Sequence, residues 1–255
     1  MIVIHTLAVV TLLPQFWSWV GFFSFLTLYW VTACLGVTLG YHRLLSHRSF
    51  KVPMWLERFF ATCGALSCQF GPLDWVGIHR QHHRFADTDR DPHNSRRGFW
   101  WSHAGWMMEA IPARANVSQY TKDLQDPYYI WLNSWFLLFQ IPLGLLLFLF
   151  GGWSAVLWGI FLRLVVTYQC TWLVNSATHF WGKELYGWTD DESLNNRWVS
   201  LVTFGEGWHA NHHSVPHSAK HGWTIEQLDP TWQHIRLLYA LGLATNVKLP
   251  KSNTA

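Results

Sequence analysis

Charged side chains are scarce in this sequence, and the first 41 residues have none. Asp, Glu, Lys and Arg make up only 13% of the 255 residues, whereas about a quarter is usual in soluble domains. Half of the residues are hydrophobic, and the 19 tryptophans, 17 phenylalanines and 8 tyrosines are typical of proteins at a membrane interface. This composition predicts an integral membrane protein and argues against a soluble globular domain.

Cysteine and net positive charge are also low, which excludes two further classes. The four cysteines lie in apolar stretches and form no Cys-x-x-Cys pair, so neither a disulfide scaffold nor a zinc ribbon is indicated. The net charge is +3, and no basic run is interleaved with aromatic residues, so we expect no nucleic-acid partner. Residues 1–13 lack the basic start and cleavage site of a signal peptide and are interpreted as a membrane segment.

Four apolar runs follow one another in two pairs. The first pair is residues 1–13 and 16–40; the first run is shorter than the roughly 20 residues of a span, so it either crosses only partly or lacks residues at its start. The second pair, residues 130–150 and 153–174, is separated only by Gly151 and Gly152, which predicts a transmembrane hairpin. Residues 53–72 contain charged and polar side chains, which favours an interfacial or partly buried helix.

The basic residues predict the topology. None precedes Arg43, and all but Arg163 fall in blocks 43–58, 80–122 and 183–255. By the positive-inside rule these blocks are cytoplasmic. We expect one all-α membrane domain, residues 1–255, with about four transmembrane helices in two hairpins (about 1–40 and 130–174) and a cytoplasmic helical cap (41–129 and 175–255). Arg163 lies in an apolar run, where charge is costly, and a structural ion pair is expected for it.

Histidine is unusually frequent, and eight of the 15 histidines form three groups. The groups are His42-Arg-Leu-Leu-Ser-His47, His79-Arg-Gln-His82-His83 and His209-Ala-Asn-His212-His213. On a helix, positions i, i+3 and i+4 share one side, so each His-x-x-His-His presents three imidazoles together. This arrangement predicts a metal-binding face.

The number of imidazoles predicts two metal ions. Imidazole binds iron, zinc, copper or nickel, so the ligand type alone does not name the metal. Eight histidines are twice what a closed tetrahedral zinc site takes. Any single group could be a structural histidine cluster, but the charge pattern independently places all three groups on the same face, just outside the membrane.

Five stretches of the sequence resemble the membrane fatty acid desaturases, specifically the stearoyl-type delta-9 acyl desaturases and their bacterial, including cyanobacterial, acyl-lipid relatives. The resemblance covers about residues 27–215. The matching stretches are Gly40-Tyr-His-Arg-Leu-Leu-Ser-His-Arg-Ser-Phe50, residues 75–83, Asp91-Pro-His-Asn-Ser-Arg-Arg-Gly98, Trp172-Leu-Val-Asn-Ser-Ala-Thr-His179 and Gly205-Glu-Gly-Trp-His-Ala-Asn-His-His213.

The resemblance implies an activity, a metal and two further ligands. The activity is formation of a cis double bond, at the delta-9 position, in a saturated acyl chain, with O2 and two electrons as co-substrates and two iron ions as cofactor. The family's ninth histidine corresponds to His179, and the asparagine that reaches one metal through water corresponds to Asn175. These two residues are i and i+4 at the end of an apolar run, so they share a helix face.

A desaturase must hold its acyl chain in register, in a narrow apolar tunnel bent beside the metals. The resemblance implies that Gln69, Trp75 and Thr171 bind the substrate at the bend. We expect the floor of the tunnel on the helix that leads to His42, at Trp30 and Cys34, because Trp30, Cys34 and Thr38 step back by four residues along one helix face.

Three carboxylates lie close in sequence to the predicted ligands: Glu206, Asp87 and Asp91. A carboxylate that accepts the second ring N–H is the usual way to orient a ligating imidazole, although surface solvation is an equal alternative. No covalent nucleophile is predicted. The remaining histidines have no ligand spacing and are assigned structural or outer-sphere roles: His5, His93, His103, His217, His221 and His234.

The electron donor and the acyl carrier are predicted from motifs that the sequence lacks. The sequence has no dinucleotide fingerprint and too few residues outside its core for a haem domain, so an external donor such as ferredoxin or a b-type cytochrome is expected. Similar coenzyme A enzymes carry Arg-Asp where this chain has Gly77 and Ile78, and basic residues where it has Glu109 and Ala110. Phosphate groups favour basic partners, so a membrane acyl-lipid is expected in preference to acyl-CoA, although several arginines lie nearby.

Two other functions compete with desaturation. A di-iron hydroxylase or alkane-type monooxygenase would share the metals, but the Asp-Pro-His-Asn-Ser and Asn-Ser-Ala-x-His stretches favour a desaturase. A haem-binding membrane electron carrier would place its axial histidines within the apolar runs, whereas these histidines lie outside them.

Overall fold

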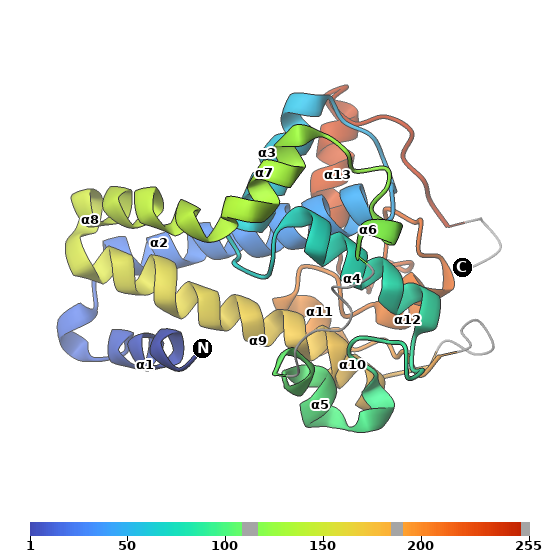
Figure 1. Ribbon diagram of the computed structural model, residues 1–255, viewed down its shortest axis with the longest axis horizontal. Coiled ribbons are helices and arrows are strands. Elements are labelled where there is room, and N and C mark those ends of the chain that lie inside the picture. Colours follow the sequence, from blue (N-terminus) through green and yellow to red (C-terminus); the bar gives the residue numbers. More distant parts are fainter. Residues whose placement is uncertain (109–116, 185–190, 251–255) are drawn as a thin grey trace.

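A computed structural model describes residues 1–108, 117–184 and 191–250, and within these ranges every regular element is a helix. Figure 1 shows an elongated arm formed by α1, α2, α8 and α9, with the remaining helices gathered at its other end. We call this second part the cap. The predicted all-α class is confirmed for the described residues.

The first half of the arm contains α1 (Ile2–Thr11), the short 3-10 turn η1 (Pro14–Phe16) and α2 (Trp19–Tyr29). The Ser18 hydroxyl caps α2 by accepting a hydrogen bond from the Gly21 amide at 2.9 Å. The helix then continues without a break as η2 (Trp30–Ser46), which is a wider π-helix. The i→i+5 bond from the His47 amide to the His42 carbonyl, 3.1 Å long, extends this pattern to the end of the helix.

The second half of the arm is a hairpin. It enters through α7 (Pro127–Trp135), η6 (Phe136–Phe139) and α8 (Gln140–Val156), and returns through η7 (Leu157–Leu162), α9 (Arg163–Asn175) and α10 (Ala177–Phe180). The chain reverses inside α8, at Gly151 and Gly152, where the sequence predicts a turn. Gly152 has φ 59°, a left-handed conformation that glycine adopts readily.

Two helical stretches are long and apolar enough to cross a membrane: Trp19–Ser46 with 28 residues and Pro127–Phe180 with 54. Large apolar side chains project from them into the surroundings, for example Phe23, Leu149 and Phe150. An apolar surface of this extent suits lipid better than water. α1 has only 10 residues, about half the length that a span takes.

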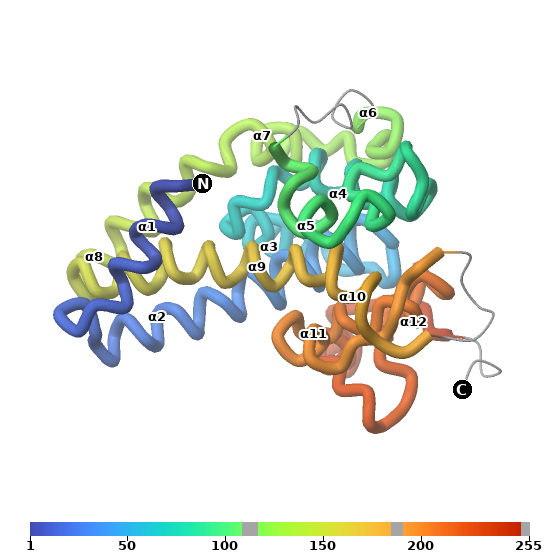
Figure 2. Tube along the Cα trace, turned by 90° about the horizontal axis from the view of Figure 1, so that it is seen from below, coloured from blue at the N-terminus to red at the C-terminus, as the bar shows by residue number. Residues whose placement is uncertain are grey.

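Polar contacts join the two halves of the arm near the Gly151 turn. The Ser18 and Ser154 hydroxyl oxygens lie 2.7 Å apart, and the Trp158 indole N–H donates to the Phe16 carbonyl at 2.8 Å. Figure 2 shows α1, α2, α8 and α9 extending together away from the cap. Helix α2 packs against α8, η7 and α9, so the long helix that carries His42 and His47 is held beside the hairpin.

The cap surrounds the end of η2. Helix α3 (Met54–Ala65) lies along η2, at a contact so close that a Cβ on Gly36 would sit 2.4 Å from the Cys63 carbonyl carbon. Leu39, Leu44 and Phe60 fill the space between the helices, each burial contributing about 1.5–3 kcal/mol. The other cap helices are α4 (Pro72–Phe85), η3 (Ser95–Arg97), α5 (Phe99–His103), η4 (Gly105–Met107), α6 (Val117–Tyr120), α11 (Arg197–Val202), α12 (His209–Ser214) and α13 (Pro230–Ala240).

Arg163 is fully buried, but the ion pair predicted for it is wrong. Its guanidinium donates to the carbonyls of Gly159 at 3.0 Å and Leu66 at 2.6 Å, and to the Gln140 side-chain oxygen at 2.9 Å. Neutral oxygens therefore satisfy this charge, and in doing so they join the hairpin to the end of α3.

Candidate metal centre and acyl cavity

Four separate helices carry the nine histidines predicted as ligands. His42 and His47 lie at the end of η2, where the i+5 hydrogen bond brings residues five apart back to the same side of the helix. The histidines of the His79–His83 stretch lie on α4, those of the His209–His213 stretch lie on α12, and His179 lies on α10. Since these helices come from distant parts of the chain, their packing brings the three sequence groups together.

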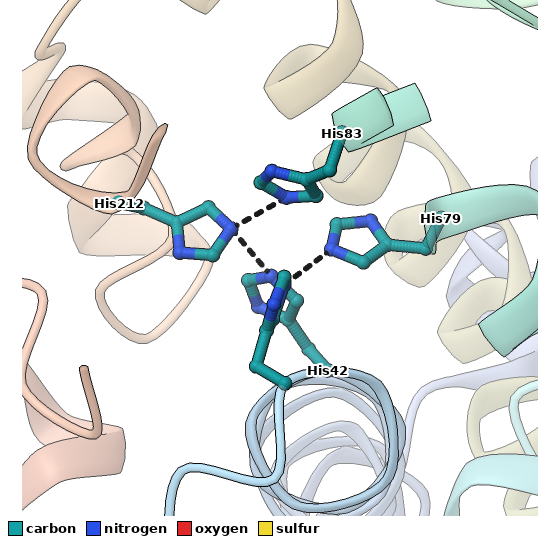
Figure 3. A group of neighbouring side chains, drawn as sticks. His42, His79, His83 and His212 are labelled. Atoms are coloured by element: carbon teal, nitrogen blue, oxygen red, sulfur yellow. Dashed lines mark hydrogen bonds between the residues drawn. The ribbon is translucent and has the colours of Figure 1, made fainter. Parts of the chain in front are cut away.

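Five of these imidazoles form what we call the first histidine group. Figure 3 shows His42, His79, His83 and His212 pointing toward one another from η2, α4 and α12. The Nε2 atoms of His42 and His212 are 3.0 Å apart, and those of His83 and His212 are 2.8 Å apart. His47 completes the group, with its Nε2 2.8 Å from that of His79.

The remaining predicted ligands form a second histidine group beside the first. The ligating atoms of His82, His179 and His209 all lie within 4.8 Å of one another. The His213 Nε2 lies 3.3 Å from that of His82, and its ring stacks on His83 at 4.4 Å. His213 therefore lies on the side of the second group that faces the first.

The donor set fits two metal ions. Neutral imidazole has one N–H donor and one lone pair, so five converging Nε2 atoms cannot all satisfy one another in a buried site. The Nδ1 atoms of His42 and His82 face the carboxylates of Glu206 and Asp91 at 2.6 and 2.9 Å. A carboxylate there fixes the proton on Nδ1 and leaves the Nε2 lone pair for a cation.

Burial keeps most of these histidines neutral, which is their metal-binding form. Burial, reinforced by neighbouring imidazoles, holds the pKa values of His79, His83, His209 and His212 well below the usual range. Burial also opposes ionisation of Glu206, but the neighbouring His42 and Arg43 outweigh it and hold the pKa of this carboxyl well below its ordinary value. The imidazoles of these four histidines are thus neutral, and the Glu206 carboxylate behind His42 is ionised.

Four carboxylates stand behind the histidines. Besides Glu206 and Asp91, Asp87 lies 3.6 Å from the His179 Nδ1, which is longer than a hydrogen bond. The fourth is Asp191, whose Oδ2 lies 2.6 Å from the His213 Nδ1. Asp191 could not be assigned from the sequence, because it lies 22 residues before its partner, in a loop with no recognisable spacing.

Two apolar cavities lie against the histidines. The larger has a volume of about 320 Å³ and is lined by Gln69, Trp75, Thr171, His79 and Asn175, among others. The smaller, about 60 Å³, shares Trp75, Thr171 and Asn175 with it and reaches His42 and His209. The Gln69 amide donates to the Thr171 hydroxyl at 3.0 Å, which holds these two polar side chains at the cavity wall.

Trp30 and Cys34, the predicted floor of the tunnel, line neither of these two cavities. Trp30 is 38% exposed and donates to His234, while Cys34 is fully buried and faces Thr231. Of the predicted row only Thr38 lines the smaller cavity, where Ala33 and Val37 lie beside it. The prediction assumed α-helical stepping by four residues, but the π-helix turns by a smaller angle per residue, so a different face meets the cavity.

The comparisons with known proteins agree with this geometry. Residues 15–244 match the family model described as "Fatty acid desaturase". The chain belongs to the fatty acid desaturase family.

Three curated desaturases are similar over nearly the whole chain. The sn-1 stearoyl-lipid 9-desaturase of Anabaena variabilis is 52% identical over 247 residues, covering 96% of this chain and 90% of the relative. The enzyme of the same name from Synechocystis is 52% identical, covering 97% and 78%. The sn-2 palmitoyl-lipid 9-desaturase of Nostoc is 48% identical, covering 96% and 87%.

The predicted enzyme class is therefore confirmed: the chain is a fatty acyl desaturase. Neither the hydroxylase nor the haem-protein alternative is favoured. The family match and the two histidine groups together show a desaturase with histidine clusters able to bind metal. Three of the histidines without ligand spacing also lie beside the candidate centre. The ring of His221 is tilted against that of His212 with a centroid distance of 4.5 Å, the ring of His93 is tilted against that of His82 at 4.2 Å, and the His103 Nδ1 lies 2.9 Å from the Ser176 hydroxyl.

Proposed function

We propose that this desaturase introduces a cis double bond at the delta-9 position of a saturated acyl chain esterified in a membrane glycerolipid. The observation that carries the proposal is the apolar cavity whose wall includes His79 and Asn175, because it can hold an acyl chain beside the histidine centre. The three similar proteins are each named as lipid 9-desaturases, which supports both the position and the carrier.

The proposed cofactor is a pair of iron ions. The nine histidines would hold them, five in the first group and four in the second, with Asn175 reaching the second through water. When bound, the irons supply the dioxygen chemistry that removes two hydrogens from the acyl chain. Glu206, Asp87, Asp91 and Asp191 would orient the ligand rings.

Several side chains would hold the substrate rather than the metals. Trp75 and Thr171 line both cavities, and in the proposal they would fix the acyl chain at this shared wall. The polar Gln69–Thr171 pair marks one point on an otherwise apolar wall. A chain held in one register presents the same carbon pair to the centre each time, which is what a single positional outcome requires.

The carrier proposal also rests on what lies beside α4. Gly77 faces Val117, and Ile78 is buried and lines the larger cavity, so these two positions offer no charge to a coenzyme A phosphate. Glu109 and Ala110, the other two positions in the carrier argument, lie outside the described residues. The proposed setting is a single domain with four membrane segments in two hairpins and the cap in the cytoplasm.

Dioxygen chemistry sets the electron requirement. Reduction of O2 to two waters takes four electrons; the acyl chain supplies two with its two hydrogens, so two more electrons and two protons must come from outside. The proposed source is a reduced carrier protein such as ferredoxin or a b-type cytochrome.

Expression in a bacterial host of defined lipid composition tests the proposal. The expected product is a new delta-9 monounsaturated acyl chain in extracted glycerolipid, located by gas chromatography and mass spectrometry. The His79→Ala variant should give none at equal membrane abundance. In detergent, purified enzyme should desaturate added stearoyl-glycerolipid; conversion of stearoyl-CoA without any glycerolipid would contradict the carrier, and a hydroxylated product would contradict the reaction.

A further inference from the structure

Four arginines lie exposed on one stretch of the cap between the end of α4 and the start of α5. They are Arg84, Arg90, Arg96 and Arg97, and we call them the arginine patch. The guanidinium carbons of Arg84 and Arg90 lie 5.4 and 3.7 Å from the centre of the same ring, that of Phe85. That ring holds two like charges close together, and no carboxylate of the described residues pairs with either.

The other two arginines extend the patch. Arg97 lies over the Trp101 ring at 3.2 Å, and Arg96 pairs with the exposed Glu192 at 3.0 Å. The same stretch contains three acidic residues, of which only Asp89 is exposed. Asp87 and Asp91 point inward toward His179 and His82, so the outer surface of this segment is positive although its sequence is mixed in charge.

The patch begins beside the metal centre. Phe85 follows His83 by two residues on α4, and His83 is partly exposed while its ring contacts His47, His79 and His212. In Figure 1 α4 ends on the side of the cap away from the Gly151 turn of the arm. A lipid headgroup would be expected near the arm, whereas this surface is open to a protein from the aqueous side.

We propose that the arginine patch is the docking surface for an acidic electron-carrier protein, which delivers electrons at the His83 edge of the centre. This inference rests on the proposed function, since it supplies the two external electrons that desaturation requires. A carrier that transfers one electron at a time must dock twice per double bond. Such encounters are weak and brief, and opposite surface charges raise their association rate.

A paired charge reversal tests the patch. Purified enzyme in liposomes would receive electrons from reduced [2Fe–2S] ferredoxin, and product formation would be measured against ferredoxin concentration. The Arg84→Glu/Arg90→Glu variant should raise KM for ferredoxin at least about tenfold at low salt, with kcat within about twofold. Added salt should raise KM for ferredoxin steeply in the wild type and only slightly in the variant. The reason is that salt screens the attraction between opposite charges, which the variant no longer has.

Matched controls separate docking from catalysis. Arg236→Glu reverses an exposed arginine on α13 and should leave KM unchanged, and Arg84→Lys/Arg90→Lys should stay close to wild type. Dithionite with methyl viologen supplies electrons without docking, so wild type and the Glu variant should then react at equal rates. An unchanged KM for ferredoxin, or an equal loss with the chemical reductant, would overturn the docking surface. Wild-type enzyme inactive with both reductants would instead count against the proposed function.

Discussion

Glu206 has a central position among the side chains around the candidate metal centre. One oxygen accepts from His42 at 2.6 Å, and the other pairs with the Arg43 guanidinium at 3.0 Å. Arg43 also pairs with Asp229 at 3.0 Å, so the orientation of His42 depends on a buried network that reaches α13. The His221 Nδ1 lies 3.4 Å from the Glu206 oxygen that accepts from His42, but it makes no hydrogen bond to it.

We expect Glu206→Gln to weaken metal binding without unfolding the cap. Gln keeps the shape but loses the charge that stabilises the His42 N–H, and such changes typically cost 10–100-fold in metal affinity. The measurement is iron per protein after dialysis against graded chelator concentrations. Glu226→Gln, an exposed carboxylate in the same region, is the control and should retain wild-type iron. Equal iron retention in both variants would remove Glu206 from the centre.

Asp191 has the corresponding position behind His213, at the second group. We expect Asp191→Asn to lower iron content toward one ion per chain, because the first histidine group does not include its partner. The exposed Asp89 offers the matched substitution Asp89→Asn, expected to keep two ions. Metal analysis with Mössbauer spectroscopy would distinguish loss of one site from loss of both, and an Asp191 variant with two unperturbed sites would refute the assignment.

At the scale of elements, the π-helix η2 determines which of its side chains line the smaller cavity. Ala33 and Val37 line the smaller cavity, whereas Trp30 contacts His234 on α13. We expect Ala33→Phe to fill part of the roughly 60 Å³ cavity and shift the products toward shorter chains. In contrast, Trp30→Ala should keep the parental chain-length distribution.

Product profiles from cells at matched expression test both variants together. The opposite pattern, with Ala33→Phe silent and Trp30→Ala producing longer chains, would favour the tunnel floor predicted from α-helical stepping. A combined shift in both variants would mean that the acyl chain contacts both sides of η2.

The contact between η2 and α3 depends on glycine at positions 36 and 64. A Cβ on Gly36 would lie 2.4 Å from the Cys63 carbonyl carbon, and one on Gly64 would lie 2.5 Å from the Tyr41 ring. We expect Gly36→Ala to destabilise the protein by about 1–3 kcal/mol, because backbone cannot move aside as a side chain can. In Gly144→Ala the nearest atom is the tip of Ile160 at 3.3 Å, so this control should be close to neutral.

Thermal unfolding of the detergent-solubilised protein measures this difference. For a protein of this size, 1 kcal/mol corresponds to a shift of roughly 2–4 °C in Tm. Equal Tm values for the two glycine variants would mean that the helices can separate slightly without cost.

At the scale of the whole molecule, the metals would join helices that are distant in sequence. The two histidine groups draw ligands from η2, α4, α10 and α12. A ligand that binds only the folded state stabilises it, so we expect chelation of the metals to lower Tm and readdition of iron to restore it. His42→Ala/His212→Ala should have the lower Tm from the start and respond less to chelator. A chelated wild type with unchanged Tm would show that packing alone holds the cap.

Much of this protein can be predicted from local patterns. The lack of charge in the first 41 residues, the Gly151-Gly152 turn and the spacing of the histidines depend on neighbours in the chain, and they were enough to predict the helical class, the hairpin turn and the family. The tertiary structure decided other features: which five of the predicted ligands gather in one group and which three in the other with His213 beside them, the pairing of His213 with Asp191, and the exposure of Ala33 rather than Cys34 to the cavity. The physical reason is that these features depend on how helices distant in sequence pack. They also depend on the smaller rotation per residue in the π-helix η2, which cannot be read from the side-chain pattern.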